Sequence, residues 1–173
     1  MLWKLVAWVV SRKPIADYLI RRAQHTPYFH LDGYMNRWWL FNGYGNDTST
    51  PDKQRQEKRW SRLPAIRVHH ILREDLARDM HDHPWNARTI VLRGWYDEER
   101  LLYSFADWNV DQEFTRRRGD TATLKFGEYH NITRVSEGGV WTLFFTWKYM
   151  GTWGFWVNGK KVPWKEYTNG GAA

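Results

Sequence analysis

From Pro64 onward the sequence is a succession of short apolar stretches with no helical pattern between them. Gly, Asp, Asn or Pro separates each stretch from the next, as turns separate strands. A long series of short strands without helices implies a closed barrel or a two-sheet sandwich. We therefore predict an all-β domain. The expected strands are AIRVHHILR (65–73), RTIVLRGWYDEE (88–99), RLLYSFA (100–106), EFTRRR (113–118), TATLKF (121–126), NITRV (131–135), VWTLFFTWKYM (140–150) and WGFWV (153–157).

The first sixty residues have a different pattern. Apolar residues recur at helical spacing over 2–10, and Pro14 suits the first turn of a second helix over 15–24. YMNRWWLF (34–41) is expected to form a strand, and 42–52 an exposed loop because it is rich in turn-forming residues. We expect residues 1–60 to form a helical and loop extension packed on a barrel domain of residues 61–173.

Composition removes several classes of protein. The chain of 173 residues contains no cysteine, which excludes disulfides, thiolate zinc sites and a cysteine nucleophile. No apolar span is long enough for a transmembrane helix, and the N-terminal apolar run is too short for a signal peptide, so a cytoplasmic location is expected. The alternative for the helix over 2–10 is that it lies on a membrane surface.

The chain is basic, with a net charge of +7, and contains 13 tryptophans. Basic and aromatic residues together can bind nucleic acid. Most tryptophans, however, lie within apolar runs such as VWTLFFTW, where burial is the better explanation. Nucleic-acid binding therefore stays an alternative that we do not favour.

A pair of histidines is the main candidate for chemistry. In a strand, residues two apart share a face, so His81 and His83 can both point into a barrel while Asp82 points away. Imidazole suits Fe, Mn, Ni, Cu or Zn, but two histidines need a further ligand. The segment GDTATLKFGEYH (119–130) has the length of a hairpin that could bring His130 beside the pair. The alternative is that these histidines only form hydrogen bonds within a polar barrel.

In these residues the sequence resembles the cupin superfamily, whose two motifs are Gly-x5-His-x-His-x3,4-Glu-x6-Gly and Gly-x5-Pro-x-Gly-x2-His-x3-Asn. The positions that match are His81, His83, Gly94, Gly119, Gly127 and His130. The resemblance implies a double-stranded β-helix, or jelly-roll barrel. The C-terminal segment, with its HDHPW, Trp-Gly-Phe and Val-Pro-Trp elements, also resembles small cupin-like proteins of phages and bacteria that have no assigned activity.

The sequence departs from both motifs. The positions that differ are Asp75 for the first Gly, Ala87 or Arg88 for the Glu, Lys125 for the Pro and Arg134 for the Asn. Losing the Glu leaves three histidines, which is similar to the thiol dioxygenase branch of the cupins. The resemblance therefore implies a divalent transition metal, with Fe(II) favoured and Mn, Ni or Zn as alternatives, bound by His81, His83 and His130.

We expect a metal-binding cupin, of the mononuclear non-haem Fe(II) dioxygenase type, that acts on a small anionic molecule. The alternatives are a cupin similar to sugar-nucleotide isomerases and epimerases, or a non-catalytic cupin that binds a ligand or nucleic acid. Whether the chain forms a homodimer stays open.

Two arginines and two glutamates are further candidates. Arg88 and Arg134 stand where the cupin motifs place inward-facing residues, and a buried arginine needs an anionic partner. They are predicted to bind a substrate carboxylate or phosphate, the alternative being a salt bridge with Asp75 or Glu98. Glu98 and Glu99 can reach the cavity or lie in solvent at a strand end. Of the adjacent His69 and His70, only one can face inward, and we expect a core or surface position rather than a ligand.

Overall fold

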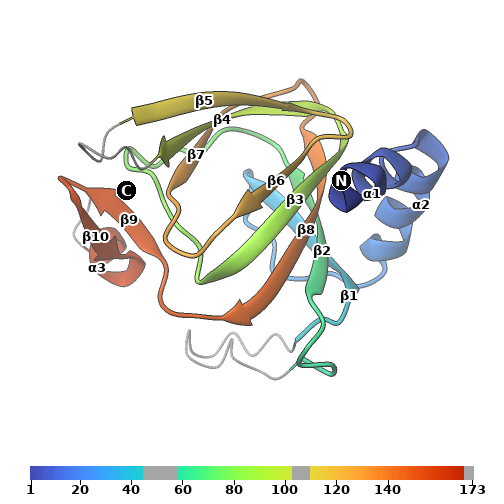
Figure 1. The fold of residues 1–173 in the computed structure, drawn as a ribbon, viewed down its shortest axis with the longest axis horizontal. Coiled ribbons are helices and arrows are strands. Elements are labelled where there is room, and N and C mark those ends of the chain that lie inside the picture. Colours follow the sequence, from blue (N-terminus) through green and yellow to red (C-terminus); the bar gives the residue numbers. More distant parts are fainter. Residues whose placement is uncertain (45–57, 103–109, 170–173) are drawn as a thin grey trace.

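The computed structural model describes residues 1–44, 58–102 and 110–169, and Figure 1 shows their arrangement. Two helices precede the strands and a short one follows them. The helices are α1 (Leu2–Val10), α2 (Lys13–Gln24) and α3 (Trp164–Asn169). The strands are β1 (Met35–Phe41), β2 (Ala65–Ile71), β3 (Trp85–Arg93), β4 (Trp95–Leu102), β5 (Val110–Arg117), β6 (Thr121–Leu124), β7 (His130–Val135), β8 (Val140–Tyr149), β9 (Gly154–Val157) and β10 (Lys160–Pro163).

The strands form two layers. The larger layer is a sheet in the order β1-β2-β8-β3-β6, and the smaller contains the sheet β5-β4-β7 and the hairpin β9-β10, all with antiparallel pairing. His81 bridges the two parts of the smaller layer, since its backbone pairs with His130 of β7 and with Phe155 of β9. Within the described residues, no strand pairing joins the larger layer to the smaller one.

The interior lies between the two layers. One buried cluster contains Ile71, Val91 and Val140 from the larger sheet together with Tyr96 and Ile132 from the smaller one. The larger sheet is also covered on its outer face, where α1 and α2 pack against it (Figure 1). Burial on both faces explains why β8 has apolar residues on both of its faces, as the stretch over 140–150 indicated.

The outer core joins the helices to the sheet. Small and aliphatic residues of α1 and α2 meet alternate residues of the central strands. The buried members of this cluster are Ala7, Ala16, Ile20, Ala23, Val68, Ile90, Leu92, Leu143 and Phe145. In the region described, no helix is long and apolar enough to cross a membrane.

One expected strand is divided in two. The stretch over 88–99 was predicted as a single strand, but Gly94 has φ +79° and separates β3 from β4. A Cβ at this position would lie 2.5 Å from Ser136 Oγ and 2.8 Å from the Gly139 carbonyl oxygen, so glycine is needed both for the backbone angle and for the space. The chain passes from the larger layer to the smaller one at this corner.

Most other expected elements agree closely with the structure, although residues 100–102, expected to begin a separate strand, continue β4. The helix over 2–10 is confirmed as α1, while α2 begins at Lys13, two residues earlier than predicted. Asn158 and Gly159 both have positive φ and connect β9 to β10, which confirms the predicted hairpin. The helix α3 was not predicted, and the predicted segments over 45–52 and 103–106 lie outside the described residues. The first sixty residues contribute β1 to the larger sheet as well as the two helices.

Candidate metal centre

Backbone pairing places His81 opposite His130. The two residues exchange both of their N–H···O=C hydrogen bonds, each 3.0 Å long, so they form a directly opposed pair across an antiparallel bridge. Opposed residues project to the same face, and the two imidazole centroids lie 4.8 Å apart.

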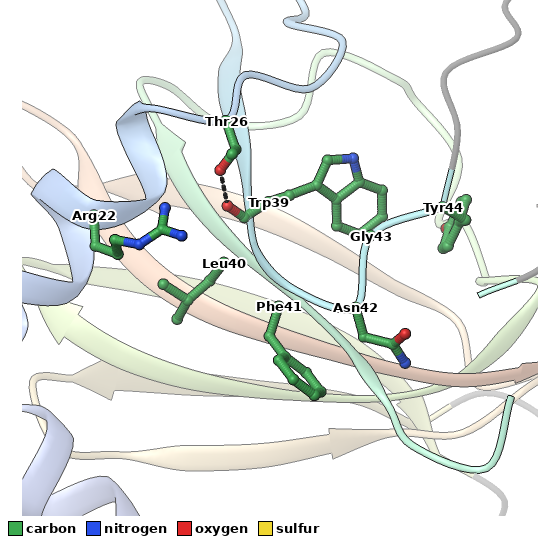
Figure 2. Close-up of a pocket in the computed structure, with 8 residues that line it drawn as sticks. All are labelled: Arg22, Thr26, Trp39, Leu40, Phe41, Asn42, Gly43 and Tyr44. Carbon is green, nitrogen blue, oxygen red and sulfur yellow. Dashed lines mark hydrogen bonds between the residues drawn. The ribbon is translucent and has the colours of Figure 1, made fainter. Parts of the chain in front are cut away.

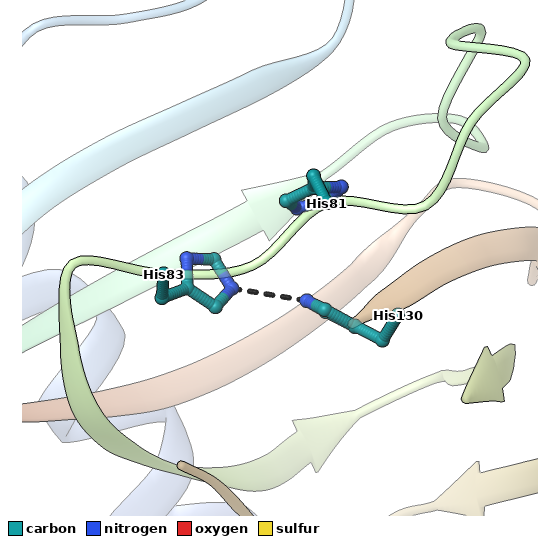
Figure 3. A group of neighbouring side chains, drawn as sticks. All are labelled: His81, His83 and His130. Carbon is teal, nitrogen blue, oxygen red and sulfur yellow. Dashed lines mark hydrogen bonds between the residues drawn. The ribbon is translucent and has the colours of Figure 1, made fainter. Parts of the chain in front are cut away.

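His83 completes the cluster from the loop that leads into β3. Its Nε2 lies 2.9 Å from Nε2 of His130, and its ring centroid lies 5.3 Å from that of His81. Figure 3 shows the three side chains pointing toward one another from two separate segments of the chain. One ring nitrogen from each histidine falls within 4.8 Å of the others. The structure therefore brings together the three histidines that the two motif spacings selected.

Asp82 points away from the cluster, as the alternation along an extended segment requires. Its side chain is fully buried, accepts a 2.7 Å hydrogen bond from the Gly154 N–H and lies 2.5 Å from Lys161 Nζ. Asp82 thereby fixes the β9–β10 hairpin to the segment that carries His81 and His83.

Desolvation favours the neutral form of His81 and His83. Desolvation, followed by the neighbouring His130, lowers the pKa of His81 from 6.5 to about 4. Desolvation likewise lowers the pKa of His83 to well below its ordinary value. Neutral imidazoles with available lone pairs are what a metal ion needs from histidine ligands.

A buried carboxylate faces Nδ1 of His130, the ring nitrogen that points away from His83. Glu98 is fully buried, and its Oε2 lies 3.6 Å from Nδ1 of His130, which makes no hydrogen bond. Arg100 and Arg116 lie 2.9 Å and 2.6 Å from Oε1 of Glu98. Burial raises the pKa of Glu98, but His130 and the two arginines outweigh it and lower that pKa to about 2. Of the two positions considered for Glu98, the structure shows the interior one.

This carboxylate favours one tautomer of His130. A proton on Nδ1 faces the negative charge of Glu98 and leaves the lone pair of Nε2 directed at His83. Metal-binding histidines commonly have such a carboxylate behind them, which fixes the ring orientation and the tautomer. The arrangement therefore prepares His130 Nε2 as a ligand atom.

The three nitrogens fit a metal ion. Two ligands at the 2.0–2.1 Å typical of Zn–N bonds lie about 2.9 Å apart at a right angle and about 3.4 Å apart in a tetrahedron. The 2.9 Å separation of the His83 and His130 nitrogens falls in this range. The ligand atoms of the whole cluster lie within 4.8 Å of one another and would have to move closer to bind a single ion, and all three donors suit a divalent transition metal.

The other two histidines of this region lie elsewhere. His69 is buried and stacks on Phe144 with the ring centroids 4.9 Å apart, and desolvation lowers its pKa well below the ordinary value. His70 stacks on Trp141, with centroids 4.0 Å apart, and its Nε2 is 2.9 Å from the Gly138 carbonyl oxygen. One histidine faces each side of the sheet, and neither belongs to the three-histidine cluster.

The structure does not bring Arg88 and Arg134 to the histidines, and the prediction that they point into the barrel is wrong. The Arg88 guanidinium lies 4.7 Å from the ring centroid of Trp3 in α1 and donates to Thr121, on the outer face of the larger sheet. Arg134 is 67% exposed and pairs with Asp97 at 2.7 Å and with Glu113 at 3.9 Å.

Local backbone geometry explains both positions. In β3 the inward positions fall to Ala87 and Thr89, so Arg88 faces outward by alternation. Between β4 and β7 the register shifts, so that Glu98 pairs with Ile132 while Asp97 pairs with Arg134. This bulge sends Arg134 to the outer face, and no motif spacing could have indicated it.

A different arginine, which the sequence analysis missed, lies inside. Arg67 of β2 is buried and shares the inward face of the larger sheet with His69. Its guanidinium lies over four aromatic rings at 4.7–5.4 Å from their centroids; the rings belong to Tyr28, Trp39, Tyr44 and Trp85. Trp85 in turn stacks on His83 with the centroids 6.1 Å apart. One indole ring therefore lies between Arg67 and His83.

Arg67 has little to satisfy its charge. It donates a hydrogen bond from an Nη to the Tyr44 hydroxyl, and its buried Nε has no partner. Across the ranges that the structure describes, no carboxylate pairs with it. The visible clue in the sequence was a charged residue inside the apolar strand AIRVHHI, with Ile66 and Val68 on either side.

Two surface pockets lie apart from the histidines. The larger, of about 410 Å³, runs along the end of β1 and shares Trp39 and Tyr44 with the rings around Arg67 (Figure 2). The smaller, of about 150 Å³, contains Asp97 and Arg134 on the outer face of the β5-β4-β7 sheet. None of the three histidines lines either pocket, so the candidate site is defined by its ligand atoms and not by its volume.

Comparison with known proteins supports the fold. No family model and no curated protein matches the chain. Among solved structures, the chain is similar to vicilin from Corylus avellana (hazelnut), with a TM-score of 0.54 and 9% identity over 78% of this chain and 35% of that one. It is also similar to an oxalate decarboxylase, with a TM-score of 0.50 and 12% identity over 78% of this chain and 31% of that one.

A third similar structure is hydroxypropylphosphonic acid epoxidase from S. wedmorenis, with a TM-score of 0.49 and 12% identity over 72% of this chain and 56% of that one. The chain thus matches only part of each of these longer proteins, and at these identities the likeness shows the fold alone. The fold is that of the cupins, as the resemblance implied.

Proposed function

We propose that the protein is a metal-dependent cupin enzyme in which His81, His83 and His130 bind one divalent transition metal ion. Within this proposal Fe(II) is favoured, with Mn, Ni or Zn as alternatives, and the reaction is of the mononuclear non-haem dioxygenase type. The convergence of three ring nitrogens within 4.8 Å carries the proposal, with the buried Glu98 behind one of them. The metal, when bound, supplies open coordination positions for a substrate and for oxygen.

The residues of the chain hold and shield this centre. Glu98 fixes the orientation and tautomer of His130. Phe144 and Trp85 contact the ring of His83, with centroids 5.7 Å and 6.1 Å away, and Phe155 lies 6.2 Å from that of His81. These aromatic side chains restrict water around the ligands, which strengthens electrostatic interactions inside the site.

The proposed substrate is a small anion whose acidic group binds Arg67. A buried guanidinium without a carboxylate partner is costly, and an anionic ligand would satisfy it. In this proposal Arg67, instead of Arg88 and Arg134, binds the carboxylate or phosphate of the substrate. A molecule that spans the width of one indole ring can reach both Arg67 and the metal ligands.

A second candidate function is acid–base catalysis without a metal, as in an isomerase or epimerase. Such an enzyme needs a histidine base held by a carboxylate, and the His130–Glu98 pair offers one. A metal requirement for activity would separate the two candidates.

Oxygen consumption after anaerobic loading with Fe(II) tests the proposed function. We expect the loaded protein to consume oxygen in the presence of at least one member of a panel of small carboxylates and phosphonates. The His83→Ala variant should lose this activity. Arg67→Met should raise KM by roughly 10- to 100-fold, the range of a charged hydrogen bond, while the outward-facing control Arg88→Met should not. Equal activity of wild type and His83→Ala would contradict the proposal.

A further inference from the structure

The helix α1 presents an apolar face to solvent. Leu2, Leu5, Trp8 and Val9 are 70%, 58%, 56% and 38% exposed, respectively. The other side of the same helix packs on the larger sheet through Trp3, Val6, Ala7 and Val10. The helix is therefore apolar on both sides, and only one side is covered. An exposed, contiguous apolar face of this kind marks an interaction surface.

The two N-terminal helices, one of which carries this face, are rich in positive charge. Arg12, in the link between α1 and α2, places its guanidinium 3.8 Å from the ring centroid of the exposed Trp8. The other basic residues of α1 and α2 are also exposed; they are Lys4, Lys13, Arg21 and Arg22. Asp17 is the one acidic residue of these two helices, and it already pairs with Lys13 and Arg93. The exposed apolar face of α1 therefore lies on a pair of helices that carry an excess of positive charge.

We propose that this face binds the surface of an anionic membrane, with α1 lying in the plane of the interface. Leucine and tryptophan side chains enter the boundary between headgroups and acyl chains, while lysine and arginine contact anionic headgroups. A helix of nine residues is too short to cross the bilayer, so it would lie on the surface. This role is independent of the proposed metal chemistry.

Charge favours the membrane over other partners. If a second copy of the chain packed on this face, two positively charged rims would oppose each other with no free carboxylate between them. Nucleic acid would satisfy the cations but would leave Leu2 and Leu5 without an apolar environment. An anionic lipid surface satisfies both groups of residues.

The helices lie away from the candidate metal centre. The helices α1 and α2 lie outside the larger sheet (Figure 1), whereas His81 and His130 belong to the opposite layer and His83 lies in the loop that leads into β3. Membrane contact through α1 therefore does not require any change at the histidines.

Co-sedimentation of the full chain with vesicles tests the proposal. We expect binding to vesicles of equimolar phosphatidylcholine and phosphatidylserine, and at least tenfold weaker binding to phosphatidylcholine alone. Leu2→Glu and Leu5→Glu should each weaken partition to the mixed vesicles at least tenfold. Neutralising Arg12 (Arg12→Gln) should weaken it about fivefold, since a cation near such a surface contributes about 1 kcal/mol. The matched control is Leu76→Glu, because Leu76 is 71% exposed but lies in a different part of the fold.

Three results would overturn the proposal. One is the absence of wild-type binding to the mixed vesicles. Another is equal loss of binding in the Leu76→Glu control. The third is a dimer in light scattering that Leu5→Glu converts to a monomer without changing vesicle binding, which would assign the face to a second copy of the chain.

Discussion

Replacing Glu98 with glutamine removes a negative charge that faces His130, Arg100 and Arg116. Glutamine keeps the shape of the side chain, so the change is electrostatic. Glu98 is fully buried, and the side chains of Arg100 and Arg116 are only 11% and 19% exposed. Breaking a buried ion pair by removing one partner costs about 3–5 kcal/mol, because the remaining charge stays buried without compensation.

We expect the free energy of unfolding of Glu98→Gln to fall by that amount. This is a large part of the roughly 5–15 kcal/mol that stabilises a typical domain. The metal affinity should also fall, by about 10- to 100-fold, because His130 loses the carboxylate behind it. Urea denaturation followed by circular dichroism measures the first effect, and titration of the apoprotein with Co(II) measures the second.

Glu113→Gln is the matched control. Glu113 lies on the adjacent strand β5, its side chain is 59% exposed, and its ion-pair contact with Arg134 is 3.9 Å long. We expect almost no change in either quantity for this variant. An exposed ion pair contributes at most about 1 kcal/mol. The reasoning would be refuted if Glu98→Gln lowered the free energy of unfolding by less than this amount and kept the wild-type Co(II) affinity.

Two further predictions concern acid and the corner between the layers. Histidine in the unfolded chain has a pKa near 6.5, whereas the pKa of His81 in the folded apoprotein is about 4. The unfolded state therefore binds more protons between these two pH values, and the free energy of unfolding should fall as the pH is lowered from 6.5 to 4. The expected slope is at most about 1.4 kcal/mol per pH unit for each such histidine. Denaturant titrations across this range measure the slope, and a flat profile would contradict the burial of these imidazoles. Gly94→Ala should cost about 1–3 kcal/mol from backbone strain, with a further cost from contact with Ser136 and Gly139. Gly127→Ala should cost less, because Gly127 has a similar φ of +81° but no atom within 4 Å of the added Cβ, and equal thermal stability of the two variants would argue against the contact.

The sequence was sufficient to predict those features of the fold and the site that follow from local residue patterns. The alternation of apolar residues and the turn residues between them predicted the strands, and Asn158-Gly159 predicted the hairpin that the structure shows. The spacing of His81, His83 and His130 predicted a cluster, because residues two apart in an extended segment, and residues directly opposed across an antiparallel pair, project to the same face. These are short-range geometric rules, so they hold without knowledge of the tertiary structure.

The predictions that were wrong or missing concern residues whose position depends on strand register and on which face of a sheet is covered. The bulge between β4 and β7 moves Arg134 to the outer face, and the packing of α1 gives Arg88 an outward contact with Trp3. The same tertiary context buries Arg67 among rings from β1, β3 and the segment before β1, which no local pattern connects. Glu98 was left open between solvent and interior for the same reason, since its partners lie on neighbouring strands.

Elemental analysis of the purified protein tests the central claim, which is that the three histidines bind one metal ion. The account predicts close to one equivalent of a divalent transition metal in the wild type after loading and dialysis. His81→Ala and His130→Ala should each lose it while keeping the wild-type circular dichroism spectrum. His70→Ala, which changes a histidine on the outer face of β2, should keep the metal. Equal metal content in the wild type, His81→Ala and His130→Ala would contradict the account.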